Sequence, residues 1–108
     1  MITVKYQRDA FRISIEGHAR SGEFGKDLIC ASATILTHTM ADVVSSMESA
    51  GYCSSSNAHI ESGKADIACT PLPEYTDSVL IAMDAVATGF GILAHYYPEF
   101  VDMETEGI

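Results

Sequence analysis

Alternating apolar and polar residues at the start of the chain predict a β-hairpin. The alternation runs through ITVKYQ (residues 2–7) and again through FRISIE (residues 11–16), and Arg8, Asp9 and Ala10 lie between the two segments. Because successive side chains of a strand point to opposite faces, this pattern is typical of two strands that bury one face. The three intervening residues predict a short turn between them.

A second hairpin is predicted in the middle of the chain. NAHIES (residues 57–62) and KADIACT (residues 64–70) alternate more weakly than the first pair, and Ser62-Gly63 forms the predicted turn. Residues 52–56, YCSSS, contain no alternation of apolar side chains and predict a loop.

Two longer segments, residues 28–51 and 76–97, have the three- and four-residue spacing of a helix. Asp27 is predicted as the N-cap of the first helix and Gly51 as its C-terminal glycine. Pro98 ends the second helix. The predicted core-facing residues are Ala33, Leu36, Met40, Val43 and Met47 in the first helix and Leu80, Met83, Ala87, Phe90 and Ala94 in the second.

The order β-β-α-β-β-α predicts one α/β domain of the α+β type over residues 1–108. The expected architecture has two layers, a mostly antiparallel sheet with two helices on one face. Residues 100–108 are expected to form a short extended tail. Gly89 and Gly91 would weaken the second helix by about 1 kcal/mol each, so both are expected to pack closely against a neighbour. The open sheet face or an edge strand favours a homodimer.

Composition excludes several classes of protein. A formal net charge of −9 with only 6 Lys and Arg residues argues against binding to a nucleic-acid backbone. The sequence contains no run of about 18 apolar residues, so no membrane span is predicted. The N-terminus lacks the apolar region of a signal peptide, and a cytoplasmic protein is therefore expected. Three cysteines without a Cys-x-x-Cys pair indicate neither a disulfide framework nor a zinc site, and no cofactor or metal is predicted.

A long connection separates a histidine from a cysteine between the first hairpin and the first helix. Eleven residues lie between His18 and Cys30, whereas strand-to-helix connections are usually about 2–6 residues long. Gly17, Gly22 and Gly25 give this connection the backbone freedom that a lid over a site requires.

The two residues suit acyl transfer. If Asp27 caps the helix, Cys30 lies in its first turn, where free N–H groups and the helix dipole stabilise a thiolate. His18 at the strand end would supply the general base, and the N–H groups of Cys30 and Ala31 would form an oxyanion hole. The Asp27 carboxylate would oppose thiolate formation, or would orient His18 or bind substrate.

Other interpretations remain open from these residues alone. An isolated cysteine is commonly a small buried side chain, and Cys53 and Cys69 are predicted to be packed in this way. A non-catalytic module that binds a partner by strand addition and a thiol redox sensor based on Cys30 are the alternatives to an enzyme. His38 is predicted to form a surface pair with Asp42.

The segment GHARSGEFGKDLICASAT (residues 17–34) resembles the signature of the ribosomal-processing cysteine protease family, Prp. That signature consists of GHA, a glycine-containing loop and Tyr-Gly-x-Asp-[Ile/Val]-[Val/Ile]-Cys-Ala. HYYPEFV near the C-terminus is also similar to the family. The chain departs from the usual pattern at Phe24, Ser32 and Thr34, where Tyr, Ala or Gly, and Ser are commoner, and these departures bear on substrate preference.

The resemblance implies that His18 and Cys30 form the catalytic pair, with Asp27 and Thr34 in supporting positions. It further implies a cytoplasmic homodimer with a two-layer fold and a mobile loop over the site. The expected substrate is a large-subunit ribosomal protein, whose N-terminal extension the enzyme removes after a motif that contains paired aromatic residues. Relatives near phage genes leave a capsid or scaffold protein open as the alternative substrate.

Overall fold

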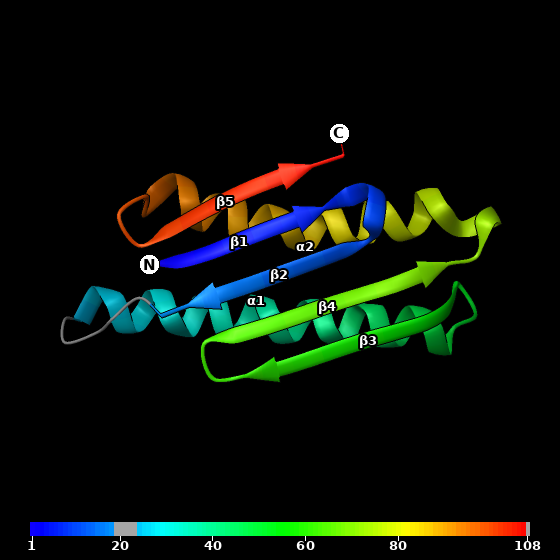
Figure 1. Cartoon of the computed structure of the whole chain (residues 1–108), viewed down its shortest axis with the longest axis horizontal. Coiled ribbons are helices and arrows are strands. Elements are labelled where there is room, and N and C mark those ends of the chain that lie inside the picture. The colour runs from blue at the N-terminus through cyan, green and yellow to red at the C-terminus, as the bar shows by residue number, and fades with distance from the viewer. Residues whose placement is uncertain (19–23, 108) are drawn as a thin grey trace.

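The chain folds into a five-stranded sheet that is covered on one face by two long helices (Figure 1). The structure, a computed structural model, describes residues 1–18 and 24–107, and describes only the backbone of residues 24–27. The strands and helices follow one another as β-β-α-β-β-α-β. Three of the four strand pairings are antiparallel. The predicted two-layer α+β fold, with a mostly antiparallel sheet and both helices on one face, is therefore confirmed.

The first hairpin forms where the alternation predicts it. Strand β1 (Ile2–Gln7) pairs antiparallel with β2 (Arg12–Gly17), and the single 3-10 turn η1 (Arg8–Ala10) lies between them. Every second residue of β1 from Ile2 is buried, and so the side chains that alternate in the sequence also alternate between core and solvent. Phe11, with a φ of 51°, takes the left-handed conformation that closes the turn.

The second hairpin is longer than its alternation predicts. Strand β3 (Cys53–Glu61) pairs antiparallel with β4 (Lys64–Pro71), and Ser62-Gly63 forms the turn as predicted. The loop prediction for residues 52–56 is wrong for all but its first residue. β3 is the edge strand, and its mostly exposed polar side chains give no alternating pattern by which to recognise it.

The predicted extended tail is a fifth strand. β5 (Val101–Glu106) pairs in parallel with β1, with Ile2 opposite Val101 and Gln7 opposite Glu106. This pairing completes the sheet order β3-β4-β2-β1-β5. β5 is again an edge strand, and only its first residue, Val101, is buried, so the segment gives a weak signal for a core strand.

Helix α1 (Phe24–Ser49) starts earlier than predicted, and helix α2 (Thr76–Tyr96) follows a 3-10 turn, η2 (Pro73–Tyr75). The prediction of Asp27 as N-cap is wrong, because the helix already begins at Phe24. An interior glycine costs a helix only about 1 kcal/mol, and each residue added to an existing helix gains a hydrogen bond, so neither Gly25 nor Asp27 prevents this extension.

The core lies between the helices and the inner face of the sheet. In α1 the buried stripe differs from the predicted one at three positions: Val44 replaces Val43 at the core, Leu36 is only partly buried, and Ile29 is buried as well. In α2 the stripe is shifted by one residue at both ends, because a 3.6-residue period leaves the margins of the stripe undetermined. The buried apolar helix residues are Ile29, Ala33, Met40, Val44 and Met47 in α1 and Val79, Met83, Ala87, Phe90 and Leu93 in α2.

Both helices also carry apolar residues on their outer sides. By length and composition alone, Leu28–Ser49 and Pro73–Tyr96 are each apolar enough to cross a membrane. Helices that pack on a sheet share these properties, so the criterion does not by itself identify a membrane span. Four large aliphatic side chains of this outer surface are exposed, with Ile35 67% and Ile81 69% accessible alongside Leu28 and Ile92.

Candidate active site

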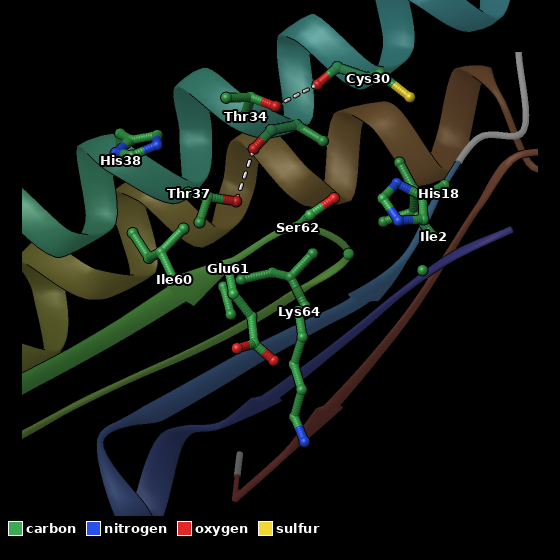
Figure 2. Close-up of a pocket in the computed structure, with 15 residues that line it drawn as sticks. Ile2, His18, Cys30, Thr34, Thr37, His38, Ile60, Glu61, Ser62 and Lys64 are labelled. Carbon is green, nitrogen blue, oxygen red and sulfur yellow. Dashed lines mark hydrogen bonds between the residues drawn. The ribbon is translucent and has the colours of Figure 1, made fainter.

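A cavity of about 570 Å³ lies between α1 and one end of the sheet (Figure 2). Residues from α1, from the end of β2 and from the β3–β4 turn form its walls, so it combines a helix face with two strand ends. Its lining includes two histidines and one cysteine. The residues that line it are Ile2, Ile15, Gly17, His18, Cys30, Ala33, Thr34, Thr37, His38, Ile60, Glu61, Ser62, Gly63, Lys64 and Ala65.

His18 follows directly on β2, and neighbouring backbone holds it on both sides. The Met1 nitrogen donates to the His18 carbonyl oxygen at 2.8 Å. Gly17 has a φ of +99°, and its N–H donates to the carbonyl oxygen of Gly63 at 2.8 Å. A Cβ at Gly17 would lie 2.1 Å from the Met1 carbonyl oxygen, so only glycine fits here. Gly17 therefore fixes the backbone next to His18 rather than loosening it.

Cys30 lies on the face of α1 that borders the cavity and is partly exposed. In Figure 2 its sulfur points toward the end of the cavity at which the His18 imidazole lies, away from His38. The structure thus brings a thiol and an imidazole, twelve positions apart in the sequence, to one solvent-accessible cavity. This is the pair of groups that nucleophilic catalysis by cysteine requires.

The predicted oxyanion hole does not fit the observed helix. Cys30 is the seventh residue of α1, counted from Phe24, and so it lies in the second turn rather than the first. Only the first four N–H groups of a helix lack intrahelical partners. The N–H groups of Cys30 and Ala31 are therefore engaged within α1 and do not point freely into the cavity. The Ala31 side chain is exposed and is not among the residues that line the cavity.

The remaining predicted site residues lie at different places. Thr34 lines the cavity one turn after Cys30, and its Oγ1 donates to the Cys30 carbonyl oxygen at 2.8 Å. Gly25 and Asp27 lie in the first turn of α1, and the surroundings of the Asp27 side chain fall outside what the structure describes. Gly22 lies outside the described residues altogether.

Sequence reasoning missed His38 and the β3–β4 turn as parts of the site. His38 lies eight residues after Cys30 on α1, so both occupy the same helix face, and it lines the far end of the cavity opposite Ile60. The helical period predicts that Cys30 and His38 share a face of α1, although His38 was expected to form a surface pair with Asp42. The turn residues carry no such local signal, because only the pairing of β2 with β4 brings them to His18.

The other two cysteines belong to the core, as predicted. Cys53 and Cys69 are buried, and Cys69 Sγ lies 3.7 Å from Met83 Sδ. Burial, and then the neighbouring Cys53, raise the pKa of the Cys69 thiol to about 12, which keeps it protonated at neutral pH. Within residues 1–18 and 24–107, no three His, Cys, Asp or Glu side chains are grouped as a metal site.

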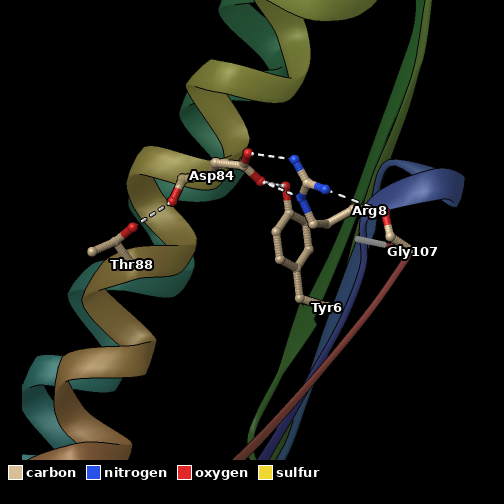
Figure 3. Close-up of polar contacts among 5 residues, drawn as sticks. All are labelled: Tyr6, Arg8, Asp84, Thr88 and Gly107. Carbon is tan, nitrogen blue, oxygen red and sulfur yellow. Dashed lines mark hydrogen bonds and ion pairs between the residues drawn. The ribbon is translucent and has the colours of Figure 1, made fainter.

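A cluster of polar side chains, Tyr6, Arg8 and Asp84, connects β1 and the turn after it to α2 (Figure 3). Asp84 of α2 accepts hydrogen bonds from Arg8 Nε at 3.0 Å, from Arg8 Nη2 at 2.9 Å and from the Tyr6 hydroxyl at 2.7 Å. Arg8 Nη1 also donates to the Gly107 carbonyl oxygen. The Arg8 hydrogen bonds, and then that of Tyr6, hold the pKa of Asp84 below its usual value, while burial raises the pKa of Tyr6. The cluster shares no residue with the large cavity.

Comparison with known proteins gives a consistent result. The family model described as cysteine protease Prp matches residues 1–102. SMU.848 from Streptococcus mutans is 24% identical, with a TM-score of 0.69 and coverage of 97% of this chain and 91% of that chain. The essential ribosomal processing protease Prp from S. aureus, in complex with a covalently linked product peptide, is 18% identical, with a TM-score of 0.73 and coverage of 98% and 100%. No curated protein matches the sequence.

Proposed function

Because the chain belongs to the cysteine protease Prp family, and is therefore a cysteine protease, we propose that it removes the N-terminal extension of a large-subunit ribosomal protein. The family match confirms the resemblance of residues 17–34 to the Prp signature. One observation carries the assignment of the catalytic pair, namely that Cys30 and His18 line the same cavity. The described fold supports it further, since a protease of this fold from S. aureus is a ribosomal processing enzyme.

The proposed reaction begins when the peptide binds in the cavity and its scissile carbonyl approaches Cys30. His18 accepts the thiol proton, and the thiolate sulfur forms a bond to the carbonyl carbon. The tetrahedral intermediate collapses as the imidazolium of His18 protonates the leaving amine, which leaves a thioester on Cys30. His18 then takes a proton from water, and the resulting hydroxide attacks the thioester carbonyl. The C–S bond breaks to release the acid product, and the imidazolium of His18 returns its proton to the Cys30 thiolate.

The walls of the cavity support a substrate with a large apolar side chain. The buried residues Ile15, Ala33 and Ala65 and the exposed Ile60 contribute apolar surface to the cavity. Burying an aromatic side chain there would remove both surfaces from water, at about 25 cal/mol for each Å² of apolar area. We therefore propose that cleavage follows an aromatic-containing motif, and that an aromatic side chain anchors the peptide next to Cys30.

We further infer that the protein acts in the cytoplasm as a homodimer. The exposed aliphatic side chains on the outer surface of the two helices, Leu28, Ile35, Ile81 and Ile92, supply apolar area that a second copy can cover. A self-complementary contact of this kind is the usual basis of a two-fold dimer. The supporting roles of Asp27 and Thr34 remain predictions.

The test combines cleavage with thiol labelling. The purified protein is incubated with N-terminally extended ribosomal-protein peptides that carry aromatic pairs, and products are identified by mass spectrometry. Cys30→Ala should abolish cleavage without unfolding the protein. His18→Ala should lower the rate at least a hundredfold, because general acid–base catalysis commonly contributes about 10²–10⁴-fold. His59→Ala is the control, since His59 is exposed on β3 and its imidazole pairs with Glu61 at 3.3 Å.

Labelling with iodoacetamide separates the alternatives. A thiol paired with His18 should react below pH 7 and should lose that reactivity in His18→Ala, whereas a binding module would have an ordinary thiol. Cys53 and Cys69 should stay unlabelled in the native protein because both are buried. Cleavage that survives Cys30→Ala would overturn the assignment of the nucleophile. Cleavage of capsid or scaffold peptides in preference to ribosomal ones would replace the proposed substrate.

A further inference from the structure

The imidazole of His18 lies directly against the α-carbon of Gly63 in the β3–β4 turn. A Cβ placed on Gly63 would be 2.4 Å from His18 Nε2 and 3.1 Å from both Cδ2 and Cε1. Separations below about 3.4 Å are tighter than ordinary carbon contacts, which are optimal near 3.5–4.0 Å. The three atoms belong to one rigid ring, so the contact can be relieved only if the whole imidazole moves by rotation about the side-chain bonds of His18.

The conformation of the turn does not by itself account for this contact. Gly63 has a φ of +76°, and Gly51 after α1 has a φ of +87°. Both conformations favour glycine. The surroundings differ, because a Cβ at Gly51 would meet nothing within 4 Å. Gly63 is thus required twice, once by the turn and once by the histidine, whereas Gly51 is required only by its backbone.

The backbone holds the turn and the histidine in a fixed relation. The Gly63 carbonyl oxygen accepts the N–H of Gly17, the residue directly before His18, at 2.8 Å. The neighbouring register of β2 and β4 places Glu16 opposite Lys64. The turn therefore cannot withdraw from His18 without breaking the end of the β2–β4 ladder. A side chain at position 63 would displace the imidazole rather than the turn.

We propose that Gly63 is a positioning residue for the His18 imidazole, its bare α-carbon forming the surface on which the ring lies while it faces the Cys30 thiol. The proposal rests on the proposed Cys30–His18 pair. The turn of the β3–β4 hairpin is then a part of the active site that acts through His18. Displacing a catalytic group by about 1 Å can lower the rate about 10²-fold, so a single methyl group at position 63 should lower kcat strongly.

Gly63→Ala and Gly51→Ala form a matched pair of variants. Both place a Cβ on a residue of positive φ, so both should lower the melting temperature to a similar extent. Gly63→Ala should lower kcat at least tenfold with a smaller change in KM, and should suppress the alkylation of Cys30 below pH 7. Gly51→Ala should leave kcat, KM and the pH profile of alkylation within twofold of the unmodified protein. Equal effects of both variants on kcat and on the alkylation profile would overturn the proposal.

A double variant tests whether Gly63 acts through the histidine. In a His18→Ala background the added methyl group meets no imidazole, so Gly63→Ala should cause no further loss of activity. A further loss of more than threefold would contradict the proposal. If Gly63→Ala does not fold, Gly63→Asn replaces it, because asparagine accepts a positive φ and carries the same Cβ. If the unmodified protein neither cleaves peptides nor reacts with iodoacetamide below pH 7, the proposed function fails. If the unmodified protein is active and Gly63→Ala retains full activity, only the role of Gly63 fails.

Discussion

Two glycines in α2 provide a direct test of how the helices pack. Replacing glycine by alanine inside a helix stabilises it by about 0.8–1.0 kcal/mol. At Gly91 the new methyl group would lie 3.9 Å from Met103 Sδ, an ordinary contact, so Gly91→Ala should raise the free energy of unfolding by about 1 kcal/mol. At Gly89 it would lie 2.5 Å from Leu36 Cδ2 and 3.2 Å from Cδ1. Overpacking of this kind costs about 1–3 kcal/mol.

Gly89→Ala should therefore lower the free energy of unfolding by between zero and about 2 kcal/mol, because overpacking offsets the gain in helix propensity. Urea unfolding at neutral pH measures both variants, with equal m values as the condition for comparing them. The melting temperatures of the two variants should differ by several degrees, since 1 kcal/mol corresponds to roughly 4–8 °C in a domain near this size. If Gly89→Ala gains as much stability as Gly91→Ala, the Leu36 side chain moves aside without cost and the expected overpacking is refuted.

Two further predictions concern the Tyr6–Arg8–Asp84 cluster and the outer helix surface. Asp84→Asn should cost about 1–3 kcal/mol at pH 7, because charged hydrogen bonds are lost. The pKa of Asp84 in the folded state lies below its usual value, so the contribution of the carboxylate is fully present above the unfolded-state pKa and is lost as pH falls through the folded-state pKa. In urea unfolding the difference in stability between the two proteins should therefore shrink as the pH is lowered below about 4. A difference that grows with falling pH would contradict this cause. Ile35→Glu combined with Ile81→Glu should convert a dimer to a monomer in light scattering, and an unchanged mass would exclude this surface as the interface.

The pattern of apolar residues predicted most of the fold because the sheet buries only one face. Every second residue of β1 enters the core, so the alternation in the sequence is visible without the structure. The edge strand β3 was predicted only from residue 57 onwards, and β5 only as an extended tail. The reason is the converse one, since each buries only its first residue. The glycines of α2 were predicted to pack closely, which is correct for Gly89 and wrong for Gly91, because spacing alone does not reveal which side of a helix meets a neighbour.

The site was predictable only in part. His18 and Cys30 could be identified because the elements on either side of them were clear and their chemistry is distinctive. The start of α1 could not be located, because Gly25 and Asp27 disfavour a helix locally by amounts that propagation outweighs. The contact of Gly63 with His18 depends on the register of β2 against β4, which joins residues about fifty positions apart and leaves no mark in either segment.

The parallel pairing of β1 with β5 has a consequence for synthesis of the chain on the ribosome. β1, with Ile2, Val4 and Tyr6 on its inner side, receives its second neighbouring strand only when residues 101–106 have been translated. Until then one edge of β1 exposes unpaired backbone groups to other nascent chains. A contact between such distant segments also slows folding, because the entropy of closing the intervening loop is lost before the contact forms. Proteolytic activity should consequently develop only after β5 has been translated and has paired with β1.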